Sequence, residues 1–88
     1  MPLIKLYANL RTVTGKKELT IPGGNIQEVL ENLSQEFPGL LHFLFENEKL
    51  RPRVIITLNG QTIDPAIGLN MAVSEQDQIA IFPPVAGG

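Results

Sequence analysis

The sequence has 88 residues, the size of a single domain, and 43% of them are hydrophobic while 18% are charged, so the chain can build a core. A net charge of −2 argues against a general nucleic-acid or anionic-membrane binder, which carries a basic excess. The absence of cysteine excludes disulfides, thiolate metal sites, cysteine-held iron–sulfur clusters and a cysteine nucleophile. No apolar run approaches the ~20 residues of a membrane span, and the first residues lack the layout of a signal peptide, so a cytoplasmic protein is expected.

Two strands are predicted in the N-terminal part, over residues 3–8 and 18–21, because both stretches alternate and are rich in branched or aromatic side chains. Alternation divides the first strand into an inward set of Ile4, Leu6 and Ala8 and an outward set of Leu3, Lys5 and Tyr7. The polar residues 9–17, which include Gly15, are predicted to form a hairpin connection. The sequence Pro22–Gly24 ends the second strand.

A helix is predicted next. Asn25 is its candidate N-cap, and Glu28 stands three residues later in a capping-box-like pair. The apolar residues of this helix recur at spacings of three and four and form one stripe: Ile26, Val29, Leu30, Leu33 and Phe37. Pro38–Gly39 should end the helix. Residues 40–45 are predicted to form a helical turn at one end of the core, and the charged residues 46–53 an exposed loop.

The remaining strands lie in the C-terminal half. Residues 54–58 are the strongest strand prediction, and Asn59–Gly60 directly after them is a tight-turn signal. Residues 61–63 are expected to form a short return strand, residues 64–76 a long connection, and residues 78–82 the last strand.

This order of elements predicts an α+β roll, in which one main helix covers one face of a mixed sheet of about four or five strands. The predicted domain spans residues 1–82, and residues 83–88 form an extended tail. The other face of the sheet stays open, and a partner would bind there. Alternation places these side chains on the open face: Lys5, Tyr7, Arg53, Ile55, Thr57, Gln78, Ala80 and Phe82.

The tail combines a stiff stem with a bare end. Pro83 and Pro84 lack amide donors and have a fixed φ, which favours an extended, polyproline-like stem. Gly87 and Gly88 have no side chains and the widest backbone freedom. Such a segment can thread a narrow channel and deliver its carboxylate to a distant active site. The alternative interpretation is an inert terminus that happens to hold glycine.

Three segments resemble the ubiquitin-like sulfur carriers of the MoaD/ThiS family, which includes the small subunit of molybdopterin synthase. They are IFPPVAGG at residues 81–88, IKLYANLR at residues 4–11 and LNG at residues 58–60. The family has the β-grasp (ubiquitin-like) fold, which agrees with the roll derived from the elements. The ending is the part most specific for the molybdopterin-synthase branch.

The resemblance implies a carrier rather than an enzyme acting alone. An adenylating enzyme of the ubiquitin-activating type would use ATP to convert the Gly88 carboxylate to an acyl-adenylate, and a persulfide donor would then replace AMP to leave a thiocarboxylate. Gly88 would carry the sulfur, and Gly87 would permit access. The carrier itself would bind no cofactor and no metal. A larger synthase subunit would receive the tail and use the sulfur to build the dithiolene of molybdopterin.

The same resemblance implies partner contacts. Tyr7 and Phe82 match apolar positions that contact the partner in this family, and strand alternation independently places both on the open sheet face. Exposed aromatic side chains beside an extended tail are a plausible binding hot spot. The stem residues Pro83, Pro84, Val85 and Ala86 are expected to contact the partner with them.

Several alternatives stay open. Gln76–Asp77 stands where the family often has Gly-Asp, and residues 46–53 resemble a longer subgroup that includes carriers for cysteine synthesis and other thiolations. Thiamine synthesis or tRNA thiolation could also receive the sulfur. A protein modifier would use the same activated tail to form isopeptide bonds, and a plain interaction module would use the sheet face alone. His42, the only histidine, is interpreted as a packing or boundary residue.

Overall fold

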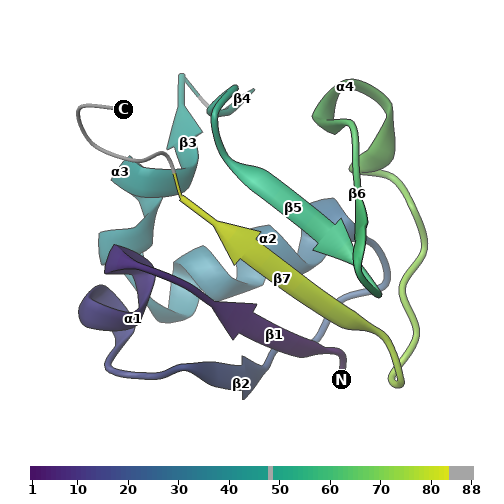
Figure 1. Ribbon diagram of the computed structural model, residues 1–88, viewed down its shortest axis with the longest axis horizontal. Coiled ribbons are helices and arrows are strands. Elements are labelled where there is room, and N and C mark those ends of the chain that lie inside the picture. The colour runs from purple at the N-terminus through teal and green to yellow at the C-terminus, as the bar shows by residue number, and fades with distance from the viewer. Residues whose placement is uncertain (48, 84–88) are drawn as a thin grey trace.

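The computed structural model describes residues 1–47 and 49–83, with Pro65 and Ala66 described by their backbone alone. Its main sheet has five strands in the order β2-β1-β7-β5-β6 (Figure 1). These strands are β1 (Leu3–Leu6), β2 (Glu18–Thr20), β5 (Ile55–Leu58), β6 (Gln61–Thr62) and β7 (Gln78–Phe82). β1 pairs parallel with β7 and the other pairs are antiparallel, so the predicted mixed sheet is confirmed.

The main helix, α2 (Ile26–Glu36), lies across one face of this sheet (Figure 1). The Asn25 side chain accepts a hydrogen bond from the Glu28 amide at 2.8 Å, as the predicted N-cap requires. The Glu28 carboxylate reaches back to the amide of Gly24 at 3.3 Å, one residue before the cap. Both side chains of the capping pair therefore accept a backbone hydrogen bond, and together they fix the point at which the chain turns from β2 into the helix.

The core lies between α2 and the covered face of the sheet. The predicted helical stripe is buried except at Phe37, which is half-buried and ends the helix as its C-cap. The inward residues of the three central strands meet the stripe: Ile4, Leu6, Ile56, Ile79 and Ile81. Because the buried residues of these strands alternate with residues that are not buried, the side chains between them lie on the open face.

The predicted hairpin connection over residues 9–17 is confirmed, because β1 and β2 pair antiparallel, but it contains a short helix that was not predicted, α1 (Asn9–Thr14). Leu10 is fully buried and anchors this helix to the core. Gly15 ends it in the left-handed conformation, with φ of 74° and its amide donating to the Arg11 carbonyl. Ala8, predicted to face inward, is exposed, because the chain leaves the strand there with φ of 53°.

The segments after α2 are more ordered than the predicted turn and loop. The turn over residues 40–45 is confirmed as η1 (Pro38–Leu40) and α3 (Leu41–Leu44). The expected loop over residues 46–53 instead begins within a small hairpin of β3 (Phe45–Glu46) and β4 (Lys49–Leu50). This hairpin forms because Phe45 pairs with Leu50 and both side chains pack against the core.

The long connection over residues 64–76 holds α4 (Pro65–Gly68) and an isolated bridge between Ala72 and Asn25. It ends in a turn that closes on Asp77, whose carboxylate accepts from the Ser74 amide at 2.7 Å and from the Asn59 side chain at 3.0 Å. The Ser74 backbone amide and then the Asn59 side-chain amide hold the pKa of Asp77 below its ordinary value. This turn thereby ties the start of β7 to the Asn59–Gly60 turn after β5.

Candidate functional site

The open face of the sheet carries the candidate site. The side chains that alternate with the core residues of β1, β5 and β7 lie on it, and they line a shallow depression of about 300 Å³. The described residues that line it are Lys5, Tyr7, Thr57, Gly60, Gln78, Ala80 and Phe82. Most of these positions were predicted from alternation alone. At the end of β7 this surface leads directly to the predicted tail.

Two stacked rings form the end of this face from which the tail departs. The parallel register of β1 and β7 places Leu6 opposite Ile81, so the next residues, Tyr7 and Phe82, come side by side. Their ring centroids lie 4.4 Å apart with an interplanar angle of 14°. Both side chains are half-buried. Each ring therefore covers part of the other and leaves an aromatic surface open to a partner.

Arg11 covers the outer side of this stack. Its guanidinium carbon lies 4.9 Å from the centroid of the Tyr7 ring, and its Nε donates a hydrogen bond to the Leu6 carbonyl at 2.6 Å. The hydrogen bond fixes the guanidinium over the ring in a cation–π arrangement. Ile55, paired with Phe82 across the antiparallel ladder, is 49% exposed on the other side. We call Tyr7, Arg11, Ile55 and Phe82 the aromatic platform.

Basic side chains gather beside the platform. A second depression of about 370 Å³ is lined by Tyr7 and Glu18 and by the cationic residues Lys5, Arg11 and Lys17. Three cations against one carboxylate make this part of the open face positive, although the whole chain is negative. Such a surface favours a partner with an acidic patch.

The structure brings together only some of the residues predicted for the site. Tyr7 and Phe82 lie on the open face in mutual contact, and Pro83, directly after them, is buried. Pro84, Val85, Ala86, Gly87 and Gly88 lie outside the described residues. A role in partner binding for Tyr7, Phe82 and Pro83 stays a prediction.

Arg11 was missed as a site residue by sequence reasoning, since residues 9–17 were interpreted as a polar connection. The signal was present in Leu10, an apolar residue shortly before Gly15, which fits a short helix ending at a glycine C-cap. Because α1 begins two residues after Tyr7, its first turn brings Arg11 back over the Tyr7 ring.

Within residues 1–47 and 49–83, no group of three or more histidine, aspartate or glutamate side chains is placed to hold a metal ion. Across the same part of the chain, no helix has both the length and the apolar character to cross a membrane.

Comparisons with known proteins give the context of this site. The model of the ThiS family matches residues 4–88. The small archaeal modifier protein 3 of Haloferax volcanii is 31% identical over 97% of this chain and 96% of its own length. The molybdopterin synthase sulfur carrier subunit of Arabidopsis thaliana is 35% identical over 97% of this chain and 80% of its own.

A solved structure agrees with these sequence matches. The small archaeal modifier protein 1 of Methanosarcina acetivorans superposes with a TM-score of 0.87 at 34% identity, covering 98% of this chain and 94% of that one. Since the superposition spans nearly all of both chains, it confirms the predicted β-grasp fold. With its mixed sheet, main covering helix and family match through residue 88, the chain belongs to the ThiS family of ubiquitin-like sulfur carriers and modifiers.

Proposed function

We propose that this protein is a sulfur carrier and that its working group is the carboxylate of Gly88. The observation that carries the proposal is the aromatic platform at the end of β7, directly before the glycine-ended tail. A partner that grips Tyr7 and Phe82 there can receive the tail in one orientation. The stem Pro83, Pro84, Val85 and Ala86 would then run into the partner's active site, where Gly87 permits passage through a narrow channel.

The chemistry needs activation, because a carboxylate is a poor acyl donor. An adenylating enzyme would join the Gly88 carboxylate to the AMP portion of ATP and release pyrophosphate. The terminal sulfur of a persulfide would attack this acyl-adenylate and displace AMP, and exchange with a thiol would release the thiocarboxylate. Every sulfur atom that reacts in these steps comes from the persulfide donor or the thiol, which agrees with a chain that has no cysteine. The carrier would hold no cofactor of its own, since the partner uses the ATP.

We propose molybdopterin biosynthesis as the pathway that receives the sulfur, with a larger synthase subunit as client. Support comes from the Arabidopsis relative, which is named as a molybdopterin synthase sulfur carrier subunit. It also comes from the ending IFPPVAGG, the part of the chain most specific for that branch. Cysteine synthesis, thiamine synthesis and tRNA thiolation are the competing destinations.

A protein modifier is the second candidate function. The Haloferax and Methanosarcina relatives are both named as modifiers, and they match this chain over nearly its whole length. Carrier and modifier share the adenylation step and differ in the acceptor, which is sulfur for one and a lysine amine for the other. A non-covalent interaction module, the third possibility, would need neither step.

The test is the intact mass of the protein after incubation with ATP, a cognate adenylating enzyme, a persulfide donor and a thiol that releases the thiocarboxylate. The carrier should gain the mass difference between one sulfur and one oxygen, and a variant lacking Gly88 should gain nothing. Failure of the intact protein to change with a demonstrably active partner would contradict both covalent functions. Adducts on lysines of cellular proteins would instead identify a modifier.

Binding variants test the platform separately from the chemistry. Phe82→Ala should weaken association with the adenylating enzyme by about tenfold or more, because central aromatic contacts dominate interface energies. Ile67→Ala is the matched control, since Ile67 is an 81% exposed apolar residue of α4 that lies outside the platform. Equal binding by both variants would contradict the role of the platform.

A further inference from the structure

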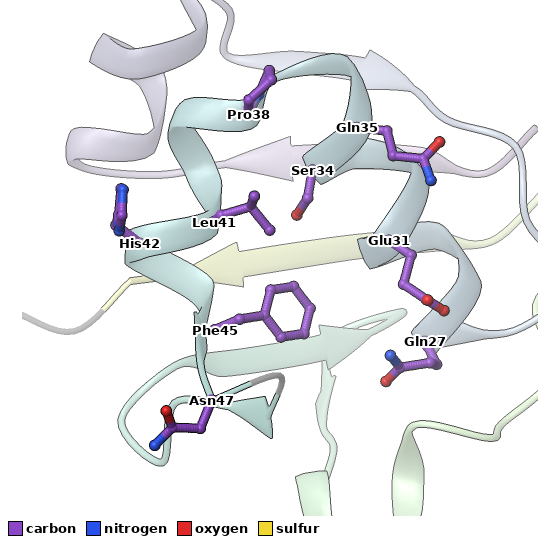
Figure 2. Close-up of a pocket in the computed structure, with 9 residues that line it drawn as sticks. All are labelled: Gln27, Glu31, Ser34, Gln35, Pro38, Leu41, His42, Phe45 and Asn47. Carbon is purple, nitrogen blue, oxygen red and sulfur yellow. The ribbon is translucent and has the colours of Figure 1, made fainter.

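A groove of about 760 Å³ lies between α2 and α3, on the helical side of the molecule rather than on the open sheet face (Figure 2). Helix α2 contributes Glu31 and Ser34 to one wall, while Leu41 and Phe45 form the other. Neither the platform nor the tail chemistry uses any of these residues.

The wall formed by α2 holds a buried hydroxyl without a partner. The Ser34 side chain is 4% exposed, and its Oγ has no hydrogen-bond partner among the described residues. Figure 2 shows Oγ directed into the space between the two helices. A buried hydroxyl left unpaired is costly, whereas a bound group that donates or accepts a hydrogen bond there would remove that cost.

Apolar side chains opposite this hydroxyl are exposed to solvent. Leu41 is 47% exposed, and the half-buried Phe45 ring points into the groove (Figure 2). The Leu41 side chain faces the groove from the first turn of α3. Together they form a surface that an apolar side chain of another molecule could cover.

The charge around the groove is mainly acidic, with one basic side chain beside it: Arg51 donates from Nε to the His42 carbonyl and pairs with Glu46 at 3.7 Å. Residues 26–48 contain five glutamates and no lysine or arginine. Of the described residues that line the groove, Glu31 is the acidic one, and its carboxylate lies at the rim (Figure 2). The His42 imidazole points away from the space between the helices. An anionic occupant, such as a C-terminal carboxylate, would be repelled here, and a cationic one attracted.

We propose that this groove docks a peptide segment of a partner protein that presents an apolar side chain next to a lysine or arginine. The apolar side chain would lie on Leu41 and Phe45, and the cation would pair with Glu31. A side-chain shift that exposes the buried Ser34 hydroxyl would then let it pair with a polar group of the segment. The proposal does not depend on sulfur transfer, because it concerns the opposite side of the molecule and is tested by binding alone.

The test is a titration of the ¹⁵N-labelled protein, followed by its amide chemical shifts, with the model peptide ALKALLKA. Two control peptides test the charge and the large apolar side chains separately: ALEALLEA reverses the charge, and AAKAAAKA replaces the leucines by alanine. We expect saturable shifts at Glu31, Ser34 and Phe45 with the first peptide, and at least fivefold weaker binding of either control. Shifts centred on the sheet face, or equal binding of a control peptide, would overturn the proposal.

Variants of the protein complete the test. Glu31→Gln should weaken binding of ALKALLKA about three- to fivefold, as expected for one exposed ion pair. Glu36→Gln makes the same charge change on the same helix outside the groove and should leave the affinity unchanged. Leu41→Ala should also weaken binding, with an otherwise unchanged spectrum showing that it folds. Equal losses of affinity in Glu31→Gln and Glu36→Gln would indicate attraction by the overall charge and would refute a specific site in the groove.

Discussion

Tyr7→Leu and Phe82→Leu should each lower the free energy of unfolding. The double variant should lose less unfolding free energy than the sum of the two single losses. The rings lie with centroids 4.4 Å apart and are nearly parallel, at 14°. Leucine keeps an apolar side chain at each position but cannot stack. Either single change therefore removes the whole stacking interaction, and the second change has none left to remove.

The size of this difference follows from the geometry. Stacked aromatic pairs contribute about 0.5–1.5 kcal/mol beyond the area they bury. Because both rings are half-buried, we expect a coupling in the lower half of that range, about 0.5–1 kcal/mol. The contact between Arg11 and Tyr7 disappears in the Tyr7 variant and in the double variant alike, so it cancels from the cycle.

Urea unfolding followed by circular dichroism measures these free energies. A chain of this length has a free energy of unfolding of about 4–13 kcal/mol, so all the variants should remain folded and comparable. A coupling below about 0.3 kcal/mol, the error of additivity for independent sites, would refute stacking in solution. It would also remove the structural basis for treating the two residues as one platform.

Three further changes test other parts of the fold, each by unfolding. Gly23→Ala should destabilise by about 1–3 kcal/mol, because an added Cβ would lie 2.5 Å from Val29 Cγ2 and 2.8 Å from its backbone nitrogen, whereas Gly24→Ala meets no atom within 4 Å and should change little. Ser34→Ala should leave stability unchanged or raise it by up to about 1 kcal/mol, and a loss of that size would show that the hydroxyl is paired within the fold. Folding lowers the pKa of Asp77. The ionised carboxylate therefore contributes its full stabilisation above the ordinary pKa of 3.8, and this stabilisation is lost as pH falls through the lowered pKa. In Asp77→Asn, Tm should therefore fall less steeply between about pH 5 and pH 2 than in the parent protein. An unchanged dependence of Tm on pH would show that Asp77 does not cause the loss of stability in acid.

The fold could be predicted because its strongest signals are local and agree with one another. The stripe from Ile26 to Leu33 marks the buried face of α2, and the alternation of residues 78–82 gave the bounds of β7 correctly. The same alternation placed Tyr7 and Phe82 on the open face. It did not reveal that they stack, because that contact depends on the parallel register of β1 and β7.

Other features could not be predicted because they depend on tertiary context. The exposure of Ala8 follows from a positive φ at a non-glycine residue, which the alternation rule does not include. Leu10 is held in α1 by the core rather than by an extended helical pattern. The unpaired hydroxyl of Ser34 lies in the wall of the groove between α2 and α3, an arrangement of the folded chain that no local sequence pattern reveals.

The aromatic platform and the groove between α2 and α3 lie on opposite sides of the molecule and differ in charge. Two partners could therefore bind the protein at the same time. Under the proposed function, an activating enzyme and a sulfur acceptor would both need the tail, so both would compete for the platform and its cations Lys5, Arg11 and Lys17. A basic, apolar segment would bind instead on the side that carries Glu31, without displacing either. Saturating ALKALLKA should therefore leave the affinity for the adenylating enzyme unchanged, whereas a second platform-binding partner should reduce it. If the peptide displaced the enzyme, the two surfaces would have to be treated as one.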